Sequence, residues 1–198
     1  MLRLETHLNS HAEARGGFPR ERQQMRLFSL MVLTASIVLG ISTSRGLAQP
    51  KEGDAIPPLE VLATKADKAV STAKDGKFNL KDLKGKKVVL FYFPKAMTRG
   101  CTIESCGFRD MIEAFDKENT VVIGFSADKL SAQEQFTEKE KLNFPLIADS
   151  EKKLMTALGV KGRATWIFDS EGKLAKVITK VSVQGHPKEC LDVVKGLK

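Results

Sequence analysis

Cys101 is the residue best placed to do chemistry, because it stands three positions after Thr98 at the start of an expected helix. The Thr98 hydroxyl can accept a hydrogen bond from a backbone N–H two or three residues further on, so Thr98 is expected to be the N-cap. Unpaired N–H groups and the positive end of the helix dipole favour an anion at Cys101, which stabilises the nucleophilic thiolate. The alternative interpretation is a buried structural cysteine that happens to begin a helix.

Cys106 supplies a second thiol five residues after Cys101. In an intact helix this separation places the two Cα atoms roughly 8–9 Å apart. A disulfide tolerates at most about 7 Å, so the two thiols can bond only if the first turns of the helix unwind. The pair is poorly placed as a structural staple and better suited to a redox role that is coupled to local unfolding.

The flanking sequence predicts the elements that position these thiols. A continuous apolar run, Val88–Phe93, is typical of a buried strand and ends at Pro94. Beyond the cysteines, apolar residues recur at the spacing of one helix face, at Phe108, Met111, Ile112 and Phe115. The stretch therefore reads as strand, loop and helix, with Cys101 in the first helical turn.

Three of these residues also carry a resemblance to a known family. Pro94, Thr98 and Cys101 form the pattern Pro-x-x-x-Thr-x-x-Cys, which resembles the signature of the peroxiredoxins. The stretch FYFPKAMTRGCTIESCGFRD, with its Cys-x4-Cys pair, is similar to the branch known as bacterioferritin comigratory protein or PrxQ. Arg163-Ala-Thr-Trp and Gly185-His186 also fit that branch, and the resemblance covers roughly Gly53–Lys198.

The resemblance implies a role for each site residue. Cys101 would be the peroxidatic cysteine, which attacks the peroxide O–O bond and becomes a sulfenic acid, and Cys106 would be the resolving cysteine, which condenses with it to a disulfide. Thr98 would orient peroxide and thiolate, Arg163 would stabilise the thiolate and the developing charge, and Pro94 would shield the pocket from water. The resemblance implies no metal and no flavin or other cofactor.

Arg99 departs from the family pattern, which usually has Pro after the Thr. Pro at the first helical position is pre-organised for the helix, since its missing N–H has no helical partner there. Arg99 loosens that turn but adds a positive charge two residues from Cys101. The two effects oppose each other, so the rate and the preferred peroxide stay open.

The rest of the chain alternates strands and helices. Strands are expected near 59–62, 76–78, 121–126, 144–148, 165–168 and 174–178, and helices at 131–141, 150–158 and 187–197, with a helical turn at 79–83 or 81–83. Ser131 and Glu134 form an apparent capping box for the first of these helices, and Asp169–Lys173 form a hairpin turn. The pattern indicates an α/β fold, and the resemblance implies the thioredoxin-like form, a central mixed sheet covered by helices on both faces.

The 198 residues divide into an N-terminal extension (1–48), a Pro-rich linker (49–58) and one domain (59–198). An apolar run of fifteen residues, Leu27–Ile41, follows Arg26 and precedes the small-x-small sequence Gly46-Leu47-Ala48, as in a signal peptide. Met25 is an alternative initiator, because the preceding 24 residues are long for a signal. These features predict an exported, periplasmic or extracytoplasmic protein, with an uncleaved membrane anchor as the alternative.

The net charge of +8 is spread along the chain rather than concentrated. Residues 1–48 contribute +3 and the remainder +5, with lysines beside acidic residues throughout. A solvated surface explains this pattern, and no motif favours nucleic-acid binding. The sequence shows no internal repeat, Gly-rich phosphate loop or zinc-type cysteine spacing.

Three further residues have structural interpretations. Cys190 shares a helix face with Val194 and Leu197, which indicates a buried small hydrophobe rather than a redox partner. His186 immediately precedes the last helix and is interpreted as a surface or capping residue. Trp166 is expected to pack in the core beside Arg163.

The leading hypothesis is a monomeric thiol peroxidase that reduces hydrogen peroxide and organic hydroperoxides and is recycled by a thioredoxin-like dithiol. An exported copper-binding metallochaperone on the same fold is a second hypothesis, although such proteins typically have Cys-x3-Cys and need neither Thr98 nor Arg163. A thiol-disulfide exchange protein is a third, although it would normally use Cys-x-x-Cys.

Overall fold

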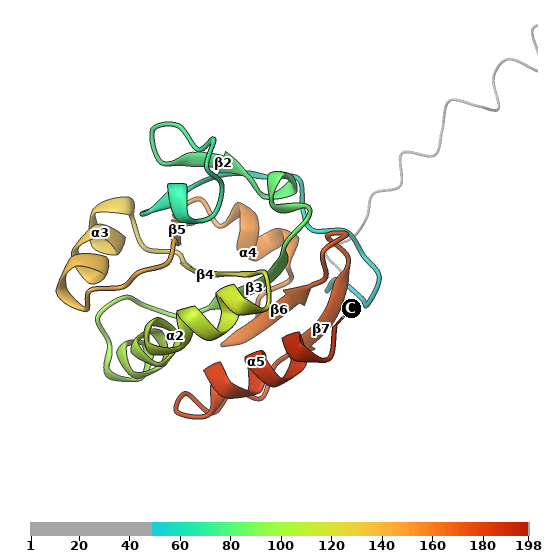
Figure 1. Ribbon diagram of the computed structural model, residues 1–198. Helices are drawn as coiled ribbons and strands as arrows, with labels where there is room; N and C mark the ends of the chain where they lie inside the picture. Colours follow the sequence, from blue (N-terminus) through green and yellow to red (C-terminus); the bar gives the residue numbers. More distant parts are fainter. Residues whose placement is uncertain (1–48, 198) are drawn as a thin grey trace, which may run out of the picture. The chain divides into compact units, whose positions relative to one another are not determined.

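A five-stranded mixed sheet forms the centre of the computed structural model, which describes residues 49–197 (Figure 1). The strands lie in the order β5-β4-β3-β6-β7, with β3, β4 and β5 parallel and β6 and β7 antiparallel to their neighbours. Their bounds are β3 Lys87–Tyr92, β4 Thr120–Ser126, β5 Leu146–Ala148, β6 Ala164–Phe168 and β7 Leu174–Ile178. The expected strands of this sheet are confirmed, each to within about two residues at its ends.

After Lys87, the central strand β3 consists of buried apolar and aromatic residues, because both faces of the sheet are covered. Val88 and Leu90 point to one side and Val89 and Phe91 to the other, as the two-residue period of a strand requires. A Cβ at Gly124, in the neighbouring strand, would lie 2.8 Å from the Phe91 ring. Because Gly124 has no side chain, the Phe91 ring can pack directly against β4.

Three helices pack against the face that holds Phe91 (Figure 1). They are α2 (Arg99–Lys117), α3 (Leu130–Lys139) and α5 (His186–Lys195). The predicted stripe of α2 is confirmed, since Phe108 and Phe115 are fully buried and Phe108 stacks on Phe91 with ring centroids 4.4 Å apart. Burial of such rings is the main force that fixes α2 on the sheet.

The opposite face is covered by smaller elements. They are the hairpin β1 (Glu60–Leu62) and β2 (Lys77–Asn79), the 3-10 helices η2 (Ala66–Lys68) and η3 (Leu80–Leu83), and α4 (Lys153–Ala157). Asn79 and Asp82 make a reciprocal capping box at η3, the helical turn expected there. The sheet order and the helices on both faces confirm the predicted thioredoxin-like fold.

Two predicted helix starts are wrong. The capping box at Ser131 and Glu134 does not form, because α3 already begins at Leu130 with Lys129 as its N-cap. The helix expected from residue 150 begins only at Lys153, since Lys152 adopts a left-handed φ of 58°. The Asp149 carboxylate accepts hydrogen bonds from the backbone N–H groups of Leu154 and Met155, the second and third residues of this short helix.

The first described residues lie against the hairpin of β6 and β7. Gly53 N donates to Leu174 O, and Ile56 N donates to Gly172 O, each at 2.8 Å. Within residues 49–197 no helix is long and apolar enough to span a bilayer. The predicted signal segment, its cleavage site and Met25 lie outside the described residues.

Candidate active site

The loop between β3 and α2 is held by a side chain from the neighbouring strand. Asp128 follows β4, and its carboxylate accepts hydrogen bonds from the Ala96 backbone N–H and the Ser126 hydroxyl, both at 2.7 Å. Met97 takes a left-handed φ of 62°, which turns the chain into the helix. The parallel pairing of β3 and β4 thus places the predicted catalytic loop and its support at the same edge of the sheet.

Cys101 is the third residue of α2 and is 1% exposed. Arg163 stands immediately before β6, the other neighbour of β3, and its Nη2 donates to the Cys101 sulfur at 3.2 Å. The sheet therefore brings together two of the predicted site residues that are 62 positions apart in sequence. A guanidinium in this position stabilises negative charge on the sulfur.

Arg163 is held in its charged form by its surroundings. Burial lowers the pKa of its guanidinium, but the hydrogen bonds and negative charges of Cys101 and Glu104 more than offset this effect, so that its pKa lies above the ordinary value. Its side chain is still 20% exposed, so solvent reaches the guanidinium that contacts the buried Cys101 sulfur.

The prediction for Thr98 is correct in position and wrong in its hydrogen bond. Thr98 is the N-cap residue of α2, but its hydroxyl donates backward to Lys95 O at 3.0 Å and makes no capping bond. Thr98 and Pro94 are both exposed, and Arg99 is the exposed first residue of the helix. The first turn thus keeps backbone N–H groups free of side-chain caps near Cys101.

Cys106 is half-buried on the same helix, and all three cysteines are free thiols. Its sulfur lies 3.8 Å from Glu140 Oε2. Burial and the Glu140 carboxylate raise the pKa of the Cys106 thiol, against an opposing effect of Arg109. Cys106 is therefore mostly protonated at neutral pH.

The sequence interpretation missed Glu104 and misjudged His186. Glu104 is fully buried, and its carboxylate pairs with Arg163 and accepts from His186 Nδ1 at 2.7 Å. His186 is also fully buried, so its interpretation as a surface or capping residue is wrong. The position of Glu104, three residues after Cys101 on the same helix face, could have revealed it, whereas only the packing of α5 on α2 reveals His186.

Tyr92 is the last residue of β3, and it pairs with Ala164, the residue that follows Arg163 in the chain. Burial, together with the charges of Cys101 and Asp128, raises the pKa of its phenol. It therefore stays protonated next to the thiol and is a further polar group that the sequence did not suggest.

Cys190 is fully buried in α5, which confirms its interpretation as a small hydrophobe. Burial, with smaller contributions from Glu189 and Glu104, raises the pKa of its thiol strongly. Trp166 is likewise buried in the core, at 1% exposure.

The raised pKa of Cys190 makes stability depend on alkaline pH. The unfolded thiol loses its proton near pH ~8.5, whereas the folded state retains it, so unfolding releases a proton and the free energy of unfolding falls as pH rises above that value. The stability that wild type gains over Cys190→Ala is expected to shrink by about 1.5 kcal/mol between about pH 8.5 and pH 10. Urea unfolding of both proteins checks this, and a difference that does not change with pH would contradict it.

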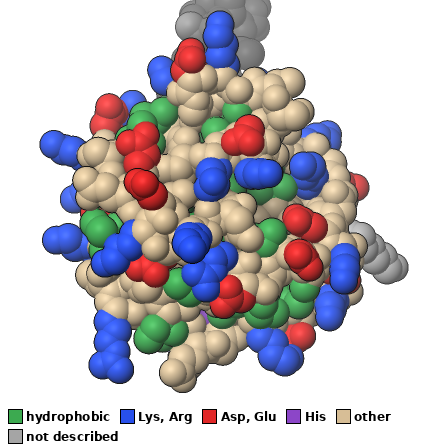
Figure 2. All heavy atoms as spheres, turned by 60° about the vertical axis from the view of Figure 1, so that its left-hand side comes forward, with side chains coloured by type: hydrophobic (Ala, Val, Ile, Leu, Met, Phe, Trp, Pro, Cys, Tyr) green, Lys and Arg blue, Asp and Glu red, His purple; other side chains and the backbone are tan. Residues whose placement is uncertain are grey.

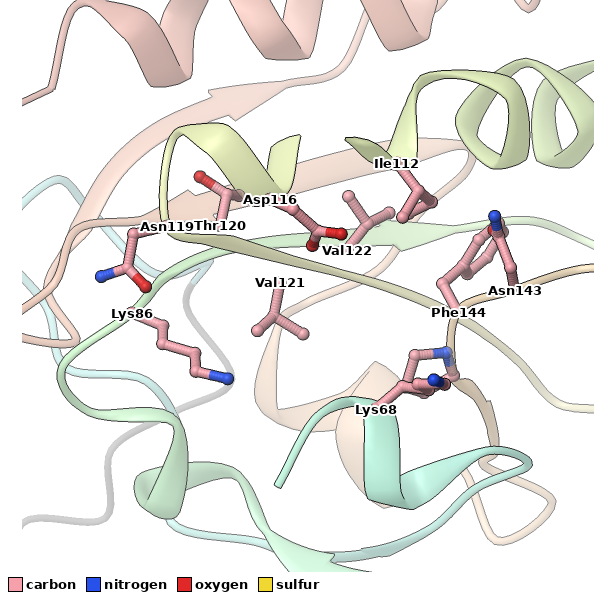
Figure 3. A pocket seen from close by; sticks show the side chains of 11 residues that line it. Lys68, Lys86, Ile112, Asp116, Asn119, Thr120, Val121, Val122, Asn143 and Phe144 are labelled. Carbon is pink, nitrogen blue, oxygen red and sulfur yellow. The ribbon is translucent and has the colours of Figure 1, made fainter. Parts of the chain in front are cut away.

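A surface cavity of about 370 Å³ opens at the other end of the parallel strands (Figure 3). Figure 3 shows Lys68 and Lys86 on one side of it and Ile112 and Asp116, from α2, on the other. It contains none of the predicted site residues. Within residues 49–197 no three His, Cys, Asp or Glu side chains gather as a metal site, so the structure lends no support to the copper-binding hypothesis.

Charged side chains of both signs are interspersed over the face drawn in Figure 2. This arrangement agrees with the interpretation of the basic net charge as a solvated surface.

Comparisons with known proteins agree with this geometry. The AhpC/TSA family matches residues 53–177. Peroxiredoxin Bcp of Bacillus subtilis is 39% identical over 132 residues, which cover 60% of this chain and 83% of the relative. The solved peroxidoxin BcpB of Mycobacterium tuberculosis is 28% identical, with a TM-score of 0.64 and coverage of 75% of this chain and 98% of that one.

A third relative is the solved bacterioferritin comigratory protein of Xanthomonas campestris, which is 25% identical with a TM-score of 0.63. It covers 70% of this chain, and 90% of its own length is matched. With the buried thiol, its arginine and the family match in place, the chain belongs to the AhpC/TSA family and, within it, to the bacterioferritin comigratory protein or PrxQ branch of the peroxiredoxins, which makes it a peroxidase of the oxidoreductase class.

Proposed function

We propose that Cys101 reduces hydrogen peroxide and organic hydroperoxides as the peroxidatic thiolate. The observation that carries this proposal is the Arg163 guanidinium, which donates to the Cys101 sulfur at 3.2 Å inside a nearly closed site. The sulfur attacks the terminal peroxide oxygen, so that an S–O bond forms and the O–O bond breaks. The leaving oxygen takes up a proton and departs as water or an alcohol, and Cys101 is left as a sulfenic acid.

Arg163 stabilises negative charge on both the attacking sulfur and the peroxide oxygens. Its Nη2 donates to the attacking sulfur, and from this position its charge would stabilise the negative charge that develops on the peroxide oxygens. Thr98, whose hydroxyl can turn from Lys95 O toward a bound peroxide, orients the substrate, and Pro94 shields one side of the site. These two roles rest on the family signature and on the position of both residues in the segment that joins β3 to the helix of Cys101.

Cys106 resolves the sulfenic acid. Its thiol attacks the Cys101 sulfur, an S–S bond forms and water leaves. Because both residues lie in α2, the first turns of the helix must unwind before the sulfurs meet. A thioredoxin-like dithiol then reduces the disulfide and is itself oxidised to a disulfide.

The substrate proposal includes organic hydroperoxides as well as hydrogen peroxide. The Xanthomonas campestris relative is described by its alkyl peroxide reduction activity. The exposed side chains of Met97 and Ile103, on the loop and first turns that surround Cys101, offer apolar contact to an alkyl group.

We also propose that the enzyme acts as a monomer.

The experiment that tests the function mixes the reduced protein, from Gln49 onward, with a slight excess of hydrogen peroxide. Stopped-flow tryptophan fluorescence follows the reaction, and mass spectrometry of peptides maps the product. Rapid oxidation to a Cys101–Cys106 disulfide is expected. Absence of oxidation, or a bond that involves Cys190, would contradict the proposed mechanism.

Export is a separate proposal, which rests on the apolar run Leu27–Ile41 and the small residues Gly46 and Ala48. It requires a donor dithiol that is kept reduced outside the cytoplasm. N-terminal sequencing of the protein recovered from a bacterial periplasmic fraction is expected to begin at Gln49. Recovery of the full-length chain in the cytoplasmic fraction would show that no export takes place.

A further inference from the structure

A buried chain of polar contacts runs from β6 to Cys101. The Thr165 hydroxyl lies 3.0 Å from His186 Nε2, and His186 Nδ1 lies 2.7 Å from Glu104 Oε1. The other oxygen of Glu104 pairs with Arg163, which donates to Cys101. Since a carboxylate only accepts hydrogen bonds, His186 Nδ1 carries the hydrogen and donates a hydrogen bond to Glu104.

Burial makes each of these contacts necessary. The side chains of Thr165, Glu104 and His186 are all fully buried. A buried carboxylate needs a donor for each oxygen, and Glu104 has one donor from Arg163 and one from His186. Without His186, one oxygen would be unpaired, and the carboxylate would no longer be fixed against Arg163.

The start of α5 is pressed against the cysteine-bearing part of α2. A Cβ at Gly107 would lie 2.9 Å from Pro187 Cγ, so the two helices approach as closely as a glycine permits. The His186 ring also meets the edge of Phe108 at a centroid distance of 5.4 Å. His186 therefore contacts α2 both before Cys106, at Glu104, and after it, at Phe108.

Unwinding of the first turns must break these contacts. Glu104 lies between Cys101 and Cys106 on the turns that have to open before the two sulfurs can bond. When this segment unwinds, Glu104 leaves both Arg163 and His186. The network that orders the reduced site therefore also opposes disulfide formation.

We propose that His186 is a positioning residue that acts through Glu104, so that it keeps Arg163 on Cys101 and also holds the helix closed after the sulfenic acid has formed. The proposal rests on the peroxidase function above. Its consequence is a partition at the Cys101 sulfenate. Opening leads to attack by the Cys106 thiol, which forms the S–S bond and releases water. A site that stays closed exposes the sulfenate to a second peroxide, which transfers an oxygen to give the sulfinate and leaves as water or an alcohol.

The two routes can be separated because disulfide formation does not depend on peroxide concentration, whereas the second oxidation does. Rapid chemical quench, alkylation of free thiols and mass spectrometry would measure both steps in the reduced wild-type protein and its variants. His186→Gln places its amide near Nε2 and loses the bond to Glu104. His186→Asn places its amide near Nδ1 and can keep that bond.

We expect His186→Gln to speed disulfide formation about tenfold and to slow the first oxidation of Cys101 about tenfold, as loss of one hydrogen bond to a buried charge implies. His186→Asn is expected to remain within about threefold of wild type for both steps. Thr165→Val, which removes the hydroxyl behind the imidazole, is expected to change both rates in the same directions by about threefold, and it keeps the test decisive should His186→Gln not fold.

Val194→Ala is the matched control, because it removes a fully buried side chain of α5 that is not part of the network. It is expected to lower stability without moving the partition. The proposal is overturned if His186→Gln and Thr165→Val form the disulfide at the wild-type rate, or if Val194→Ala accelerates it equally. Failure of the peroxidase function itself is distinguishable, since wild-type Cys101 would then not be oxidised at all.

Discussion

Replacement of Cys101 with serine is expected to abolish peroxide reduction, leaving only the rate seen without enzyme. A serine hydroxyl is almost entirely protonated at neutral pH and is a much weaker nucleophile than a thiolate. Neither remaining cysteine can take over the reaction in place. Cys190 is fully buried with a strongly raised thiol pKa, and burial also raises the pKa of Cys106.

The measurement is consumption of hydrogen peroxide by reduced protein with a small dithiol as electron donor. Cys190→Ala serves as the matched control, because it removes a thiol that lies outside the proposed chemistry and should retain wild-type turnover. Peroxide consumption by Cys101→Ser at more than a few per cent of the wild-type rate would contradict the proposal that Cys101 is the nucleophile.

Replacement of Arg163 with methionine is expected to lower kcat/KM for hydrogen peroxide by about 10²- to 10³-fold. This is the usual effect of removing one donor that stabilises transition-state charge in a closed site. The same change leaves Glu104, which is fully buried, without its guanidinium partner. We therefore also expect the free energy of unfolding to fall by about 3 kcal/mol.

A double variant separates these two effects. Arg163→Met combined with Glu104→Gln removes the buried charge together with its partner, so most of the lost stability should return while the activity does not. Steady-state kinetics and urea unfolding on the same samples provide the comparison. Recovery of activity along with stability would show that Arg163 acts only by keeping the site folded.

Both predictions follow from the way the site is assembled. The Cys101 thiol is on the first turn of α2, and Arg163, which contacts it, immediately precedes β6. The loop that joins β3 to α2 is held by Asp128, which follows β4. These segments meet because β4 and β6 are the two neighbours of β3 in the sheet. The sheet thus sets the distance between the Cys101 sulfur and the guanidinium, which is the geometry that the proposed mechanism requires.

Local sequence was sufficient to predict the elements around the thiol. The apolar run of β3 and the one-sided stripe of α2 depend on burial periods of two and 3.6 residues, which can be read along the chain. The N-cap position of Thr98 and the third helical position of Cys101 follow from that boundary. The capping hydrogen bonds could not be predicted in this way. They depend on contacts and backbone angles within each loop, as at Thr98, Ser131 and Lys152.

The sequence by itself thus predicted the helix that carries Cys101, the proposed nucleophile, and the need to unwind that helix before the proposed disulfide can form. Only the tertiary structure decided which groups surround the nucleophile. His186 lies 82 residues beyond Glu104, and nothing in its local sequence distinguishes a surface histidine from a buried one. Its role depends on the packing of α5 on α2, which buries His186 and Glu104 together. Because burial removes water, the Glu104 carboxylate needs hydrogen-bond donors from within the protein.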